Sequence, residues 1–275
     1  MASRIDRWRA AVATIGVSVL GAFALAACGS NGGGESTVAA RGTETASSAA
    51  AGPSNDGLPQ GSEPVKLNPA EFTTDIDNPY WPMSPGSRWV YRETDTTGTV
   101  EKVVVKVTDK TKTIANGVEA RVVRDTVTQN GVPVEVTDDW YAQDAEGNIW
   151  YLGEDTREYV NGKPGTQTGS FEAGVGGAQA GIAMPANPEP GTSYRQEYYK
   201  GEAEDKGAIV TVGQEQVQVP FGFFDKGVLM TRDLVPTEPK VQELKFYAPG
   251  IGPLLTVHTD TPGGRGELVS YTAGK

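Results

Sequence analysis

Apolar and polar residues alternate along much of the chain after about residue 68. Val103, Val105 and Val107 recur at every second position around Val104 and Lys106, which is the period of a strand with one buried face. No amphipathic helix of any length is evident. Between the alternating runs lie turn sequences that suit tight hairpins, because Asn-Gly accepts positive φ: Asn116-Gly117, Asn130-Gly131, Asp144–Asn148 and Asn161-Gly162. The pattern predicts a mostly antiparallel β domain.

The spacing of these turns indicates how the domain is built. They lie about 14 to 17 residues apart, so the strands are long and follow one another in a meander. Residues 68–275 are enough for one sizeable core. Because a sheet of about ten long strands curls, we expect an all-β domain shaped as a barrel or a strongly curved half-barrel, with little helix outside the signal peptide.

The same landmarks occur twice in the same order, which predicts two duplicated meanders, 85–160 and 190–272. Residues 165–187, between them, are expected to be a crossover or a lid-like loop. The matched segments, at offsets between 105 and 108 residues, are Pro85–Trp89 with Pro190–Tyr194, Val123–Asp125 with Thr231–Asp233, and Trp140–Ala142 with Phe246–Ala248.

The N-terminus has the form of an export signal. Arg4, Arg7 and Arg9 precede an uncharged apolar run, 10–27, that is short for a membrane-spanning helix. The run ends in Leu25-Ala26-Ala27-Cys28, which resembles the bacterial lipobox. We expect 1–27 to be a lipoprotein signal peptide, and Cys28 to carry palmitate-type acyl chains that hold the protein to the extracytoplasmic face of the cell membrane. The alternative is an ordinary secretory signal with an incidental cysteine.

The residues after Cys28, which is the only cysteine, change abruptly in composition. Gly, Ser, Ala, Thr, Asn and Pro dominate 28–67, and such a segment buries too little apolar surface to offset its ordering entropy. We expect a lipid-anchored disordered linker, serving as a spacer or for partner capture. The net charge of −11, without a basic patch, argues against nucleic-acid binding.

Candidate catalytic groups are few. His258 is the only histidine, which excludes histidine-rich zinc sites, and its apolar surroundings favour an ordinary strand residue. No Gly-x-Ser-x-Gly motif occurs. Carboxylates could pair for acid–base chemistry on a glycan, and Asp144, Glu146 and Asn148 could bind calcium, although a hairpin turn explains them more simply. The sequence therefore predicts no catalytic residue, metal or cofactor. The carboxylates considered as pairs are Asp75, Asp77, Asp138, Asp139, Glu154 and Asp155.

Aromatic residues offer a different candidate site. On the inner face of a barrel they would line an apolar chamber; alternatively, they simply fill the core. The rigid segment Asp77–Pro82, with two prolines flanking Tyr80 and Trp81, suits a plug at one end of the barrel. The candidate ligand-lining residues are Trp89, Tyr91, Trp140, Trp150, Tyr198 and Phe246.

Several of these segments resemble an uncharacterised family of secreted bacterial proteins and lipoproteins. They are Asn78–Pro82, Pro85–Tyr91, Trp140–Tyr151 and Tyr247–Gly252. The resemblance covers about 78–255 and implies a curved β-sheet domain with no established activity. More distantly, the Tyr247–Gly252 ending is similar to that of periplasmic curved-sheet proteins that include lipid and lipoprotein carriers.

Three functions remain open on the sequence. The leading expectation is a membrane-anchored lipoprotein that binds an apolar ligand or an envelope protein without catalysis. The alternatives are an envelope hydrolase that uses paired carboxylates and a structural or assembly factor of the cell envelope.

Overall fold

The computed structural model describes residues 57–275 except 96, 238, 240 and 260–263. The expected signal peptide and Cys28 lie outside the described residues. Within them, the only helix is the single 3-10 turn η1 (Pro69–Glu71), and almost everything else is strand or turn. None of the helical structure in this part of the chain is long and apolar enough to cross a membrane. The expectation of an all-β domain is confirmed.

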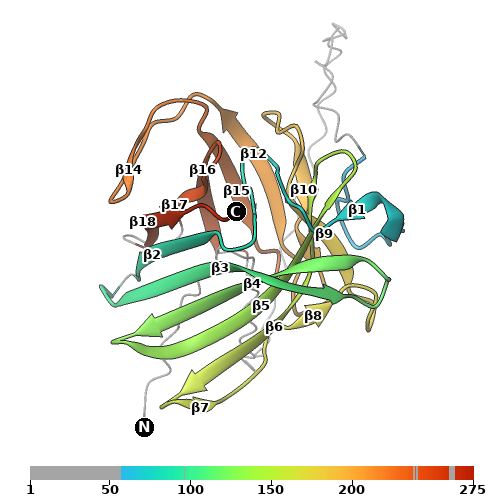
Figure 1. The fold of residues 1–275 in the computed structure, drawn as a ribbon, viewed down its shortest axis with the longest axis horizontal. Coiled ribbons are helices and arrows are strands. Elements are labelled where there is room, and N and C mark those ends of the chain that lie inside the picture. Colours follow the sequence, from blue (N-terminus) through green and yellow to red (C-terminus); the bar gives the residue numbers. More distant parts are fainter. Residues whose placement is uncertain (1–56, 96, 238, 240, 260–263) are drawn as a thin grey trace, which may run out of the picture.

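Two successive meanders form most of one large sheet (Figure 1). Every neighbouring pair of strands in them is antiparallel. The first meander contains β2 (Arg88–Thr94), β3 (Val100–Thr113), β4 (Glu119–Gln129), β5 (Val132–Asp144), β6 (Ile149–Val160) and β9 (Gln179–Met184). The second contains β10 (Ser193–Arg195), β12 (Lys206–Val212), β15 (Leu229–Leu234), β16 (Gln242–Ala248), β17 (Gly252–His258) and β18 (Arg265–Thr272).

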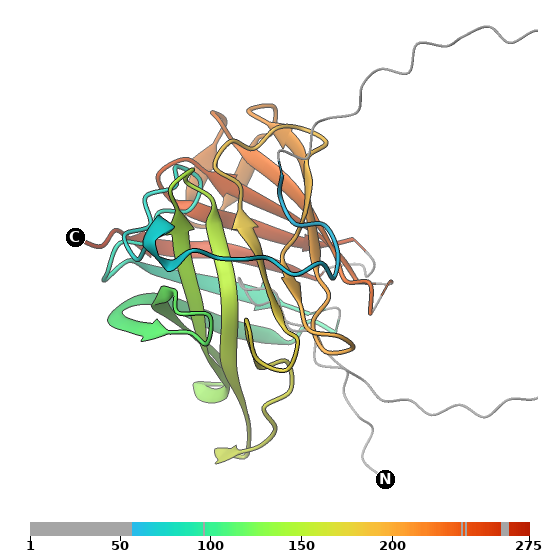
Figure 2. The same ribbon diagram turned by 90° about the vertical axis from the view of Figure 1, so that its right-hand side faces the viewer.

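The meanders meet on both sides, so the sheet is nearly closed into a barrel (Figure 2). On one side β18 pairs with β2. On the other, β10 pairs with β12, while β11 (Glu197–Tyr198), one residue further along, pairs with β9. This second junction, called the seam here, is tight: a Cβ on Gly181 would lie 2.2 Å from the carbonyl oxygen of Gln196. The expected barrel is confirmed, with more strands than the ten anticipated.

Several shorter strands lie beside the two meanders. β1 (Phe72–Thr73) extends β5, and β7 (Lys163–Pro164) and β8 (Phe171–Glu172) extend β6. β13 (Val217–Val219) and β14 (Gly222–Phe224) form a separate hairpin. Two Asn-Gly hairpins occur as expected, with φ of 52° at Asn130 and 54° at Asn161. The stretch 165–187, expected to be a crossover or lid-like loop, contains β8 and β9 and therefore supplies a strand of the barrel.

The two meanders share their order of pairing. Each begins with the same hydrogen bonds: the Gly86 N–H donates to Val107 O at 3.0 Å, and the Gly191 N–H donates to Ile209 O at 2.8 Å. The later strands follow as β4-β5-β6-β9 and β15-β16-β17-β18. The duplication of 85–160 in 190–272 stays a prediction.

Apolar side chains gather in two places. Inside the barrel, Trp81 lies between Tyr141 and Tyr247, at centroid distances of 5.6 and 6.1 Å, and is buried as a plug residue would be. On the outer face, Trp140 and Leu152 belong to a second cluster. Burial on both faces explains why strict alternation gives way to continuous apolar runs in β5 and β6.

Residues 57–67, called the strap here, cross the outside of the seam (Figure 2). Pro59 O accepts a hydrogen bond from the Arg195 N–H at 2.6 Å, and the Gln60 side chain donates to Ser193 O at 2.6 Å. Val65 and Leu67 pack on the outer cluster. The C-terminal end of the expected linker, 28–67, is therefore part of the folded domain, because its few apolar residues find a surface to cover.

Candidate functional site

Acidic side chains are buried inside the barrel. They occupy inward positions that the strand pleat would otherwise give to apolar residues; Asp125, for example, lies between the core residues Val123 and Val127. Fully buried carboxylates are rare because losing hydration disfavours their charged form. The buried acids are Glu93, Asp125, Glu135, Asp139, Glu154, Glu197, Asp205 and Asp233.

Two of these acids share a tyrosine. The Tyr151 hydroxyl lies 2.9 Å from Asp139 Oδ1 and 2.8 Å from Glu154 Oε2. Burial raises the pKa of Asp139 to about 8, although the bond from Tyr151 opposes the change. Burial and the nearby Asp139 also raise the pKa of Glu154 well above its usual range. The geometry thus fits a neutral, hydrogen-bonded carboxylic acid at neutral pH.

In the second meander, a buried lysine balances the charge of the neighbouring buried acids. Lys245 Nζ lies 2.6 Å from Asp233 Oδ2 and 3.4 Å from Glu243 Oε2. Burial alone would lower the pKa of Lys245, but Asp233 and Glu243 raise it well above its ordinary value. His258 Nδ1 lies 3.2 Å from Glu243 Oε1, so the single histidine is a buried partner of this group.

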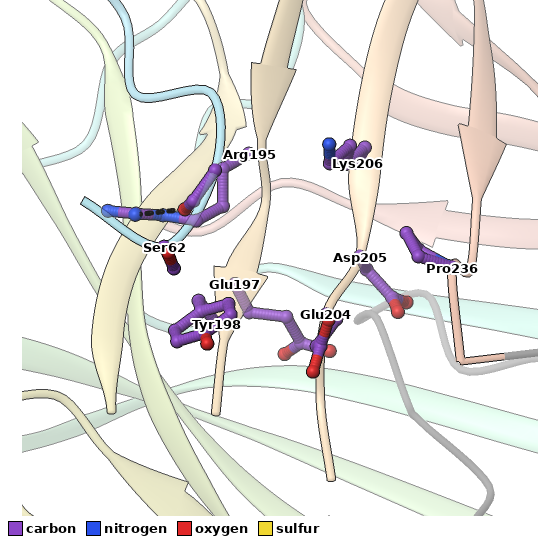
Figure 3. Close-up of a pocket in the computed structure, with 9 residues that line it drawn as sticks. Ser62, Arg195, Glu197, Tyr198, Glu204, Asp205, Lys206 and Pro236 are labelled. Carbon is purple, nitrogen blue, oxygen red and sulfur yellow. Dashed lines mark hydrogen bonds between the residues drawn. The ribbon is translucent and has the colours of Figure 1, made fainter. Parts of the chain in front are cut away.

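A pocket of about 270 Å³ opens at the seam (Figure 3). The strap forms part of its wall, and β10 to β12, the residues just before β12 and Pro236 after β15 provide the rest. This seam pocket is lined by Gly61, Ser62, Arg195, Glu197, Tyr198, Glu204, Asp205, Lys206 and Pro236.

Glu197 is the unusual member of the seam pocket. Its residue surface is 1% exposed and neither carboxylate oxygen has a hydrogen-bond partner. Burial raises its pKa well above the usual range, and Asp205, Glu154 and Asp139 add to that effect while Lys245 opposes it. A buried acceptor without a donor is costly, on the order of 1–3 kcal/mol. Glu197 is therefore a candidate ligand contact rather than a stabilising element.

Arg195, which lines the same pocket, does not donate to Glu197. In Figure 3 the guanidinium of Arg195 points away from the carboxylates. It donates to Glu63 O at 2.8 Å, to Gly61 O and, through Nε, to Ala180 O at 3.1 Å. Arg195 therefore fixes the strap across the seam.

A second pocket, of about 530 Å³, lies on the outer face of β3 to β6. One of its ion pairs is internal: Lys112 Nζ lies 2.8 Å from Glu172 Oε2 and 4.4 Å from the ring centre of Trp140. Its lining also includes Asp138, Glu154 and Asp155; of these, Glu154 is buried and already accepts from the Tyr151 hydroxyl.

The aromatic residues singled out from the sequence are spread over the fold. Trp89 and Tyr91 fill the core, where they donate to the carbonyls of Ile251 and Pro253 at 2.8 and 3.0 Å. Trp140 and Trp150 belong to the outer cluster, Tyr198 lines the seam pocket, and Phe246 is half-buried. The structure does not gather them around one described cavity, and their role in ligand binding stays a prediction.

Two of the carboxylate pairings considered from the sequence lie opposite each other on β5 and β6: Asp139 with Glu154, and Asp138 with Asp155. Asp139 and Glu154 meet at Tyr151, whereas Asp138 faces outward and pairs with Arg124. Asp75 is exposed near Arg121, Asp77 accepts from Gln143, and Asp155 accepts from Gln167.

The turn considered for calcium is held by its own hydrogen bonds. Asp144 accepts from the Asn148 N–H at 2.8 Å and from Trp150 Nε1 at 2.7 Å. Among the residues that the structure describes, no group of three or more acidic, histidine or cysteine side chains could hold a metal ion.

Sequence reasoning missed Glu197, Glu204 and Asp205. The available signal was the acidic run from Glu202 to Asp205 directly before a strand. That run is indistinguishable from a solvated turn in the sequence, whereas the structure folds it back as a hairpin beside Glu197, with the Gln196 N–H donating to Asp205 O at 2.8 Å.

Comparison with known proteins adds little to this geometry. No protein-family model matches the chain, and no curated protein matches it. The chain is similar to a solved structure from Parabacteroides distasonis that is described as a "putative lipoprotein". The identity is 15%, the TM-score is 0.37, and the match covers 70% of this chain and 97% of that one.

Proposed function

We propose that this protein is an exported lipoprotein, anchored through Cys28 to the extracytoplasmic face of a cell membrane, whose barrel binds a ligand at the seam pocket without catalysis. The sequence Leu25–Cys28 at the end of the apolar run supports the anchor. The observation that carries the binding role is Glu197, a buried carboxylate without a partner that lines a pocket. This lining favours a polar ligand over the apolar one expected from the aromatic residues.

Native mass spectrometry of the full chain tests both parts. The protein is extracted from its own membrane in mild detergent, beside a Cys28→Ser variant. We expect the wild type to carry the mass of two or three acyl chains together with a small bound molecule, and the variant to leave the membrane fraction. A wild type without acyl chains would overturn the anchor. An acylated protein that is always bare would overturn ligand binding and favour the assembly-factor alternative.

A second candidate is the envelope hydrolase, which the Asp139–Tyr151–Glu154 contact favours. The raised pKa of Asp139, about 8, suits a general acid at neutral pH. Both carboxylates are almost fully buried, however, and of the two only Glu154 lines the outer pocket of about 530 Å³, so a glycan would have to approach from that side. Release of reducing sugar from envelope glycans by the wild type, and its loss in Asp139→Asn, would establish this alternative.

A further inference from the structure

Building on the proposed binding role of the seam pocket, we propose that its ligand is a small organic cation bearing an ammonium or guanidinium group, held by Glu197 together with Glu204 and Asp205. Glu197 and Asp205 are buried, and Glu204 is half-buried. All three carboxylates line the same pocket, and they come from β11 and the turn before β12 (Figure 3).

The cations that line the seam pocket or act on Glu197 leave the Glu197 oxygens without a hydrogen-bond donor. Arg195 is committed to the carbonyls of the strap and β9. Lys206 lines the pocket but is exposed to solvent. Lys245, which also acts on Glu197, is held by Asp233 at 2.6 Å. Behind Glu197 lie the further acids Asp139 and Glu154, which bring no positive charge that would compete with a cationic ligand.

N–H donors match this pocket better than a metal ion does. The described side chains include no grouping that could coordinate a metal. Both Glu197 oxygens lack a donor, and an ammonium or guanidinium group supplies several at once. Hydrogen bonds between ionised partners are roughly twice as strong as neutral ones. The volume of about 270 Å³ lies at the lower end of ligand sites, which limits the ligand to a small molecule.

Without a ligand, a bound proton neutralises the buried carboxylate of Glu197 in place of the cation. Burial and the surrounding acids raise the pKa of Glu197, so the side chain is protonated over a wider pH range than an exposed glutamate. A bound cation would displace that proton. Binding therefore releases protons and strengthens as pH rises through the folded pKa of Glu197.

Isothermal titration calorimetry of the full chain with 1,4-diaminobutane tests the proposal, with 1,4-butanediol as an uncharged ligand of the same shape. We expect saturable binding of the diamine alone, and an apparent enthalpy that changes with the ionisation enthalpy of the buffer, as proton release requires. Glu197→Gln should weaken binding at least about tenfold, which corresponds to roughly 1.4 kcal/mol. The matched control is Glu267→Gln. It removes a carboxylate on β18 that pairs with Arg92 on β2, and it should bind the diamine as the wild type does.

Several results would overturn the cation proposal. They are equal binding of the diol, unchanged binding by Glu197→Gln, or binding of calcium or magnesium in preference to the diamine. Should Glu197→Gln fail to fold, Glu204→Gln, at a half-buried position in the same pocket, takes its place with the same expectation. If the diamine does not bind but the membrane-extracted protein carries another small molecule, only the cation proposal fails. If nothing is bound in either experiment, the proposed binding function fails as well.

Discussion

Lys245 and Asp233 form an ion pair inside the barrel, with 2.6 Å between Nζ and Oδ2. At the offsets that relate the two meanders, the corresponding residues of the first meander are Asp139 and Asp125. One half of the barrel therefore contains an acid and a base where the other contains two acids. In the first meander, burial raises the pKa of Asp125 and Asp139, so bound protons neutralise these carboxylates where Lys245 balances Asp233 in the second.

Replacing Lys245 tests how much this pair stabilises the fold. Lys245→Met leaves Asp233 and Glu243 buried without their cation, and we expect the free energy of unfolding in urea to fall by about 3–5 kcal/mol. Arg92→Met is the control, since Arg92 pairs with Glu267 but is half exposed, and it should cost less than about 1 kcal/mol. A loss for Lys245→Met no larger than that of the control would contradict a structural role for the pair.

Asp139 should make stability depend on pH. Its folded pKa of about 8 lies above the unfolded value of about 3.9, so the folded chain retains a proton that the unfolded chain releases between those values. This contribution to stability is fully present below the unfolded pKa and is lost as pH rises through the folded pKa.

Asp139→Asn removes that titration while keeping an oxygen that can accept from Tyr151. We expect the variant to be more stable than the wild type at about pH 8, by a few kcal/mol, with a smaller difference at about pH 5. Urea unfolding at both pH values measures this. Asp138→Asn, at the outward-facing neighbour paired with Arg124, is the control. A difference that is the same at both pH values would refute the assignment.

Gly181 should be essential for closing the seam. A Cβ there would lie 2.2 Å from Gln196 O and 2.6 Å from Arg195 O, and backbone cannot move aside as a side-chain tip can. We expect Gly181→Ala to destabilise the protein by at least about 1–3 kcal/mol. Gly222→Ala, whose added Cβ would lie 3.6 Å from the Phe224 ring, should be nearly neutral. Equal thermal midpoints for the two variants would show that β9 and β11 do not meet as described.

Arg195 should hold the strap. Arg195→Met leaves the carbonyls of Gly61, Glu63 and Ala180 without their donor, and we expect a loss of about 1–3 kcal/mol. Hydrogen exchange within 57–67 should also accelerate relative to Arg232→Met, whose arginine contacts Gln242 on the exposed surface. Unchanged exchange in the strap would mean that other contacts, such as that of Gln60 with Ser193, suffice.

Local sequence patterns determined much of the architecture. The period of two around Val103 to Val107 and the turns at Asn130 and Asn161 are properties of short segments, so they were readable without the fold. The contacts of residues 57–67 were not readable in this way, because Val65 and Leu67 pack against an outer cluster formed by distant strands.

By itself, the sequence determined the strand period, the hairpins, the expectation of a barrel, and an N-terminal signature of export and lipid attachment. Only the tertiary structure decided which side chains meet. Asp138 and Asp139 are adjacent and alike in sequence, yet the pleat turns the first outward to Arg124 and the second inward to Tyr151. In the same way, a local hairpin brings Glu197 beside Asp205, with the Gln196 N–H donating to Asp205 O, but it is the pairing of β11 with β9 that joins Glu197 to the closed barrel. Burial and electrostatic potential depend on register and closure between strands far apart in the chain, which no local pattern encodes.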